Sequence, residues 1–128
     1  MNPPTAAILG ASQDRGKFGN KSVRAHLRAG YHVFPVNPQG GEIEGLTVHA
    51  RLADVPLDTI DRVSLYLPPR VTLGVLDEIA AKQPKEVWFN PGTSNAEVIA
   101  KARGLGLNYV EGCSIVDLGM SPSQFAET

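Results

Sequence analysis

Glycines and cations are combined in residues 8–22, ILGASQDRGKFGNKS, in a way that suits the binding of an anion. An apolar run ends at Gly10, and the loop after it passes Arg15, Lys17 and Lys21 on the way into a predicted helix. Unpaired backbone N–H groups and the positive dipole end at a helix N-terminus favour a negative group, and glycines let that group approach the main chain. The loop therefore predicts an anion site. The alternative is that the glycines only make turns and that the cations form a solvated face.

The loop departs from both standard phosphate-binding patterns, and the departures narrow the kind of anion. In a P-loop, G-x-x-x-x-G-K-[ST], a hydroxyl follows the lysine; here five residues separate Gly10 from Gly16, and Phe18 takes the place of the hydroxyl. A dinucleotide fingerprint needs an acid at the end of the second strand to hold the ribose hydroxyls, and residues 36–38, VNP, supply none. NAD therefore fits poorly. A phosphorylated ribose explains both the missing acid and the surplus cations, and NADP and CoA each carry one.

Charge is unevenly distributed along the 128 residues. Residues 15–41 contain five cations and no acid, whereas residues 42–128 contain twelve acids and seven cations, and the net charge is −1. This patch, with a pI of 6.3 and no interleaved exposed aromatics, indicates a small polyanion as ligand rather than nucleic acid. One cysteine and three scattered histidines give no metal-ligand pattern. Because there is no secretory signal and no apolar run of about 18 residues, we expect a cytoplasmic protein without membrane contact.

Short apolar runs alternate with helical patterns, which predicts an α/β fold in one domain over residues 1–128. Helices are predicted between Asn20 and Gly30, over Val71–Lys82, and from a capping box at Ser94 through Arg103. We predict a Rossmann-like, doubly wound parallel sheet of about five strands in the order 3-2-1-4-5, with helices on both faces. The predicted strands are Thr5–Leu9, His32–Val36, Arg62–Leu67, Glu86–Asn90 and Asn108–Glu111.

This strand order brings four loops to one edge of the sheet. The chain reverses direction between the first and fourth strands, so the crevice lies beside the loops at residues 10–19 and 90–93. The loops after the second and third strands, at residues 37–38 and 68–69, open on the same edge. A binding site is therefore predicted where these loops converge.

The sequence resembles the small single-domain CoA-binding proteins, which are Rossmann-like and similar to the CoA-binding domain of the succinyl-CoA synthetase alpha subunit. The resemblance covers roughly residues 6–116. No single motif carries it; the order and spacing of several do. They are Gly10-Ala11-Ser12, Phe18-Gly19, Gly30-Tyr31, Val33, Pro35-Val36-Asn37-Pro38, Gly45, Asp61, Pro68, Trp88, Asn90-Pro91-Gly92 and Gly112-Cys113.

The resemblance implies that the loop after the first strand meets the CoA phosphates, that the next two loops border the nucleotide, and that the fourth approaches the pantetheine arm. A lysine that follows the second-strand proline in the synthetase is replaced by Gln39-Gly40-Gly41, so Arg15, Lys17 or Lys21 is expected to supply that charge. The cofactor-binding residues predicted from the loops and the resemblance together are Gly10, Ala11, Ser12, Gln13, Arg15, Lys17, Phe18, Gly19, Asn20, Lys21, Val36, Asn37, Pro38, Leu67, Pro68, Pro69, Asn90, Pro91 and Gly92.

We expect a binder of CoA or acyl-CoA that performs no catalysis of its own. The resemblance covers only the CoA-binding domain of the synthetase and not its second domain, which has the phosphorylated histidine. Cys113 lies near the predicted ligand edge, but no cation in residues 110–117 would lower its pKa, so a buried and inert thiol is expected. One alternative is an NADP-dependent or acyl-transfer enzyme subunit that needs a partner chain; another is an interaction module with a vestigial pocket. A homodimer or a partner enzyme is a further expectation.

Overall fold

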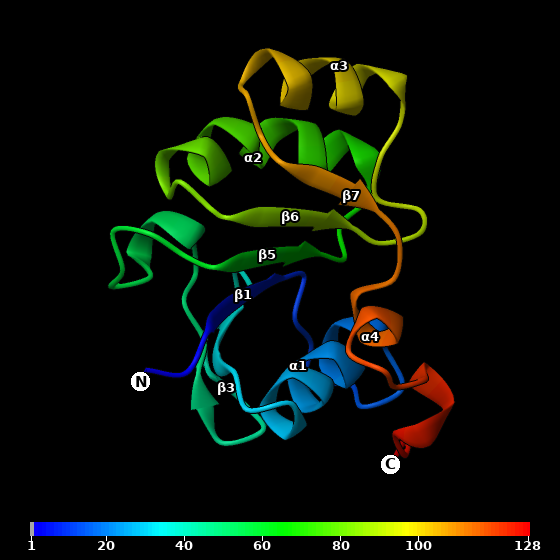
Figure 1. Cartoon of the computed structure of the whole chain (residues 1–128). Helices are drawn as coiled ribbons and strands as arrows, with labels where there is room; N and C mark the ends of the chain where they lie inside the picture. The colour runs from blue at the N-terminus through cyan, green and yellow to red at the C-terminus, as the bar shows by residue number, and fades with distance from the viewer. Residues whose placement is uncertain (1) are drawn as a thin grey trace.

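The computed structural model describes residues 2–128 and contains a five-stranded parallel sheet (Figure 1). Its strands lie in the order β2-β1-β5-β6-β7 and follow the predicted apolar runs. Two short strands, β3 (Glu42–Ile43) and β4 (Leu46–Thr47), form a separate antiparallel hairpin that contacts β2. The sheet strands are β1 (Thr5–Leu9), β2 (His32–Val36), β5 (Arg62–Leu65), β6 (Glu86–Phe89) and β7 (Tyr109–Glu111).

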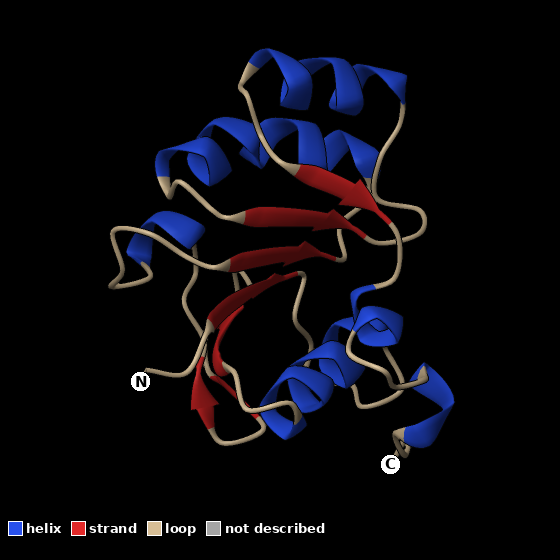
Figure 2. Cartoon of the chain, in the orientation of Figure 1, coloured by secondary structure: helices blue, strands red, loops and turns tan. Residues whose placement is uncertain are grey.

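Helices cover both faces of the sheet, as Figure 2 shows. Helix α1 (Phe18–Arg28) lies on one face together with the short helices α4 (Ser114–Asp117) and η2 (Pro122–Gln124). Helices α2 (Pro69–Ala81) and α3 (Ala96–Gly104) lie on the other face, and η1 (Leu52–Asp54) contacts α2. None of the helices in residues 2–128 has the length and apolarity needed to cross a membrane.

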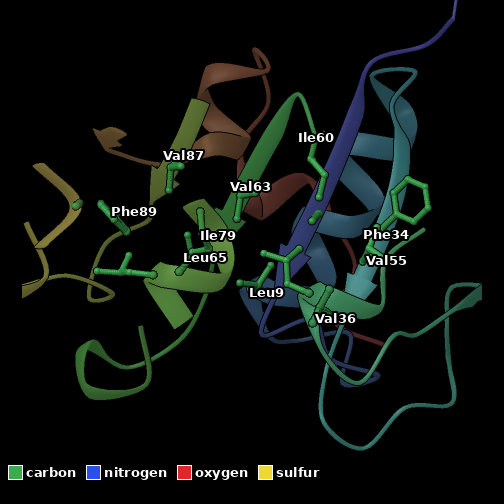
Figure 3. Packing of buried hydrophobic residues seen from close by; sticks show 14 of the residues in the cluster. Leu9, Phe34, Val36, Val55, Ile60, Val63, Leu65, Ile79, Val87 and Phe89 are labelled. Atoms are coloured by element: carbon green, nitrogen blue, oxygen red, sulfur yellow. The ribbon is translucent and has the colours of Figure 1, made fainter. Parts of the chain in front are cut away.

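Alternate residues of the sheet point into two separate apolar clusters. In β1, Leu9 joins the cluster under α2 that includes Leu65 and Ile79 (Figure 3), while Ile8 joins the cluster under α1 with Val23. All five side chains are almost completely buried. Since both faces are covered, the strands read as continuous apolar runs in the sequence.

The position predicted for the third strand is wrong, although the Rossmann-like architecture is confirmed. The predicted strand Arg62–Leu67 contains β5, which pairs directly with β1 instead of lying outside β2. The outer edge of β2 is met by His49, whose N–H donates to the Pro35 carbonyl (3.0 Å) and whose carbonyl accepts from the Asn37 N–H (3.0 Å). Counted as the third strand, this single bridge restores the 3-2-1-4-5 pattern, with β7 beyond it. The chain therefore reverses between β1 and β5, not between β1 and β6.

Helix α1 begins earlier than its sequence predicts. Its N-cap is Lys17, and Asn20, the predicted cap, lies inside the helix, where its side-chain amide donates to the Ser12 carbonyl (2.9 Å). The start of α1 is thus held against the loop after β1. Helix α3 follows its predicted span, although Asn95 caps it, accepting from the Val98 N–H at 2.9 Å.

Candidate functional site

Two glycines let three segments meet at the end of β1. Gly10 has a φ of +84°, in the left-handed region, and a Cβ at this position would collide with the carbonyl of Tyr66 after β5. A Cβ on Gly19 would collide with the carbonyl oxygen of Gly10. The first turn of α1 and the loop after β5 can therefore both lie directly against the end of β1.

The first turn of α1 has backbone donors that are available to a ligand. Its Asn20 and Lys21 N–H groups donate to the Lys17 carbonyl, each at 3.1 Å. For the N–H groups of Phe18 and Gly19, residues 2–128 provide no backbone acceptor. The first turn also contains no acidic side chain. The positive end of the helix therefore presents free N–H groups, an arrangement that favours an anion.

The five cations of residues 15–41, which we call the basic segment, have different environments. Arg15 pairs with Glu44 (3.3 Å) and donates to the Thr128 carbonyl oxygen (2.9 Å). The Lys21 side chain is buried, with its Nζ 5.9 Å from the centre of the Phe18 ring. Arg24 and Arg28 both lie over the ring of Phe125, with their Cζ atoms 5.5 and 4.7 Å from the centre of the ring. Most of the basic segment thus holds α1 to the hairpin and the C-terminal residues.

Lys17 is the cation of this segment that lines a cavity beside the first turn of α1. We call this the central cavity; it has a volume of about 300 Å³. It lies among the loops that follow β1, β5 and β6, which are three of the four loops predicted to converge. Its lining residues are Gly10, Lys17, Phe18, Gly19, Tyr66, Leu67, Pro68, Pro91, Gly92 and Thr93.

A second cavity adjoins the central cavity through Gly10 and Leu67, which line both. We call it the apolar cavity; its volume is about 250 Å³. Arg51 and Glu78 are its charged residues, and they form a pair 3.6 Å apart. Aliphatic side chains and a proline make up most of the wall. The full lining is Leu9, Gly10, Val36, Pro38, Ala50, Arg51, Leu52, Leu67, Val71, Val75 and Glu78.

A third cavity, the Cys113 pocket, adjoins the opposite part of the central cavity. It has a volume of about 170 Å³ and shares Phe18, Tyr66 and Pro91 with the central cavity. It shares no lining residue with the apolar cavity. The three cavities thus lie in the order apolar, central, Cys113 along the carboxyl ends of the strands, and we call this row of neighbouring cavities the groove.

The family is identified by a match over almost the whole chain. A family model described as a CoA binding domain matches residues 4–119. The chain belongs to this family. Its resemblance to CoA-binding proteins, inferred from dispersed motifs, is confirmed.

Relatives of this CoA-binding domain include parts of much longer ligases. The chain is 33% identical over 93 residues to the ADP-forming acetate–CoA ligase I subunit alpha of Pyrococcus furiosus, a match that covers 68% of this chain and 20% of that subunit. It is 32% identical over 83 residues to an ADP-forming acetate–CoA ligase of Methanocaldococcus jannaschii, covering 65% of this chain and 12% of the ligase. The domain therefore spans a fifth or less of these curated relatives.

Solved structures share the fold of this CoA-binding domain. A conserved hypothetical protein from Pyrococcus furiosus superposes with a TM-score of 0.80 at 32% identity, covering 91% of this chain and 99% of that one. The dinucleotide-forming acetyl-coenzyme A synthetase 1 of Ca. Korarchaeum cryptofilum, in complex with phosphate and ADP, gives a TM-score of 0.73 at 29% identity. That match covers 87% of this chain and 26% of the synthetase chain. The fold thus occurs both as a short chain and inside long ones.

Most residues predicted to contact the ligand line the groove of this CoA-binding domain or a fourth, polar cavity of about 270 Å³ beside it. Ala11, Arg15, Asn20, Lys21 and Pro69 line none of these four cavities. The others are distributed as follows: Gly10, Lys17, Phe18, Gly19, Leu67, Pro68, Pro91 and Gly92 at the central cavity; Val36 and Pro38 at the apolar cavity; Asn90 at the Cys113 pocket; and Ser12, Gln13 and Asn37 at the polar cavity.

Two of the predicted asparagines hold the loops rather than offering free amides. The Asn90 amide donates to Ser64 Oγ and to the Leu65 carbonyl, each at 2.8 Å, and its oxygen accepts from the Ser114 N–H at 2.9 Å. The Asn37 amide donates to the Ala11 carbonyl at 2.8 Å. Both side chains therefore fix the shape of the cavity walls.

Sequence reasoning missed several groove residues. Val71 and Val75 line the apolar cavity, yet their helical spacing indicates only a core-facing stripe. Arg51 lies in an irregular segment that carries no motif. Tyr66 could have been found, because it directly precedes the predicted Leu67; burial raises the pKa of its hydroxyl above the ordinary value.

Proposed function

We propose that the chain binds CoA or acyl-CoA in the groove and performs no catalysis of its own. The observation that carries this proposal is the order of the three cavities over the first turn of α1. An apolar cavity suits an adenine ring, free N–H groups with Lys17 suit a pyrophosphate, and the Cys113 pocket lies where the pantetheine arm would end. Membership of the CoA binding domain family supports the same ligand.

The lining of the groove supports binding rather than chemistry. Glu78, its carboxylate, is held by Arg51 and by the Ala53 N–H, which donates to it at 2.8 Å. His26 lies outside the groove and is buried, which lowers its pKa to about 4. In the described residues, neither group is placed to act as a base beside the thiol end of the ligand.

Isothermal titration with CoA, acetyl-CoA, NADP and NAD tests the proposal. CoA and acetyl-CoA should bind, and NAD should bind at least about tenfold more weakly because it lacks the ribose phosphate that a charged hydrogen bond would hold. Binding of NADP without binding of CoA would overturn the proposal.

A matched pair of variants tests the location. Val71 lines the apolar cavity and is 39% exposed, whereas Val110 lies on β7 at 38% exposure and lines none of the four cavities. Val71→Trp should fill the place proposed for adenine and weaken CoA about tenfold or more, while Val110→Trp should bind CoA like the wild type. Equal affinities of the two variants would place CoA elsewhere.

A second candidate function is that of an acyl-transfer or NADP-dependent enzyme subunit completed by a partner chain. The observation that favours it is that the domain corresponds to a fifth or less of the ligases that it matches. Native mass spectrometry of the purified protein would distinguish a monomer or homodimer carrying CoA from a complex with a second chain.

A further inference from the structure

The Cys113 pocket differs from the rest of the groove in its chemistry. Its walls come from four segments: the start of α1, the loops after β5 and β6, and the C-terminal residues that form α4 and η2. None of its lining residues carries a charge. They are Phe18, Tyr66, Asn90, Pro91, Cys113, Ile115 and Pro122.

The polar groups of the pocket are used inside the wall. The Tyr66 hydroxyl lies 3.1 Å from Ser114 Oγ, and the Asn90 amide is committed to Ser64 and Leu65. Burial raises the pKa of Tyr66, so this hydroxyl stays neutral at physiological pH. An apolar, uncharged group is therefore the occupant that the pocket favours, because a charged group would lose its hydration without gaining a partner.

The walls of the pocket are fixed by the core around them. Ile115 is fully buried and packs with Ala25 of α1 and with Phe125, which is 3% exposed. This cluster holds α4 and η2 against α1, and Asn90 ties the Ser114 N–H to the loop after β6. The cavity therefore exists before any ligand enters, which lowers the cost of filling it.

We propose that the Cys113 pocket receives the acyl group of a short- to medium-chain acyl-CoA. This inference rests on the proposed function, since it requires the carrier to lie along the groove with adenine in the apolar cavity. The thioester end then reaches the far end of the central cavity, where Phe18, Tyr66 and Pro91 border both spaces. A volume of about 170 Å³ admits an aliphatic chain of limited length.

Titration of the full chain with CoA and with acetyl-, butyryl-, hexanoyl- and palmitoyl-CoA tests this inference. Affinity should rise from acetyl- to hexanoyl-CoA by about fourfold for each methylene that enters the pocket. Palmitoyl-CoA should gain nothing beyond hexanoyl-CoA, because a volume of about 170 Å³ leaves no room for the rest of the longer chain. Equal binding of CoA and all its thioesters would overturn the acyl site while leaving the proposed function intact; a failure of CoA itself to bind would overturn both.

Two substitutions of Cys113 separate the effect of the pocket's volume from the effect of the thiol. Cys113→Phe should fill the pocket and abolish the chain-length dependence, and its circular dichroism spectrum, compared with that of the wild type, reports whether the variant is folded. Cys113→Ala removes the thiol but keeps the space, and should retain the dependence. Chain-length dependence that persists in Cys113→Phe would place the acyl group outside the pocket. The wild-type series decides the question even if Cys113→Phe does not fold.

Discussion

Lys17 and Arg51 line different parts of the groove and should therefore contact different phosphates. Lys17 borders the central cavity at the first turn of α1, and Arg51 borders the apolar cavity, paired with Glu78 at 3.6 Å. The Arg51 side chain is 67% exposed, so a ligand could recruit it without breaking a buried ion pair. On our proposal, Lys17 contacts the pyrophosphate and Arg51 the ribose phosphate.

Reversing the charge of Lys17 should weaken CoA by at least roughly 1.5–3 kcal/mol, the range for hydrogen bonds to charged groups, or about tenfold or more. Calorimetry with Lys17→Glu should give an equal loss of affinity for dephospho-CoA if the lysine contacts the pyrophosphate; a smaller loss would assign it to the ribose phosphate.

Arg51→Gln should weaken the binding of CoA but not that of dephospho-CoA. Lys101→Glu, which makes the same charge change on α3, is the control and should bind CoA normally.

The role of each cation in the basic segment was not predictable from the sequence. Arg15, Lys17 and Lys21 belong to one run, and only the fold separates them. Arg15 contacts Glu44 and Thr128, which lie 29 and 113 residues away along the chain. Such long-range partners leave no mark on local composition, whereas the glycines around Lys17 are a local feature and led us to predict an anion site there.

At the level of the elements, local periodicity predicted the strands and helices, but it did not predict that β5 lies beside β1. Residues 48–49 are too short and too irregular to read as a strand, yet His49 occupies the edge of β2. β5 lies beside β1, and its loop forms part of the central cavity. The convergence of loops was predicted correctly because all parallel strands end at the same edge, whatever their order.

Gly19 should tolerate no side chain, since a Cβ would collide with the Gly10 carbonyl oxygen. Gly19→Ala should lower the free energy of unfolding by about 1–3 kcal/mol, as is typical of overpacking, when measured by urea denaturation. Gly74, an exposed position within α2 with open space around it, is the matched control. Gly74→Ala should stabilise by about 0.5–1 kcal/mol through helix propensity. A neutral Gly19→Ala would show that α1 can shift away from β1, contrary to our account of the site.

For the molecule as a whole, one buried charge links the sheet to α1 and α4, which lie on the same face of it. The Arg62 side chain, 5% exposed, donates to Glu86 at 2.5 Å and to Asp117 of α4 at 2.6 Å. Its guanidinium lies 5.0 Å from the centre of the Trp88 ring. Nε2 of His26, in α1, lies 3.4 Å from Nη1 of Arg62. α1, β5, β6 and α4 thus meet at one network, away from the groove.

Protonation of His26 should weaken this network and the whole fold. Burial, with a further contribution from Arg62, lowers the pKa of His26 from 6.5 to about 4, so the folded state keeps the ring neutral while the unfolded chain protonates it. The unfolded state therefore binds more protons between pH 6.5 and 4, and stability present above pH 6.5 should be lost as the pH falls, by an amount on the order of 3 kcal/mol.

Urea denaturation of the wild type and of His26→Gln from pH 7 to 4 measures this loss of stability. The variant should have a flatter profile, and His32→Gln, at an exposed position of β2, should follow the wild type. An unchanged slope in His26→Gln would assign the acid sensitivity to carboxylates such as Asp61, whose pKa is lowered by its hydrogen bond from the Thr5 N–H and by Lys85.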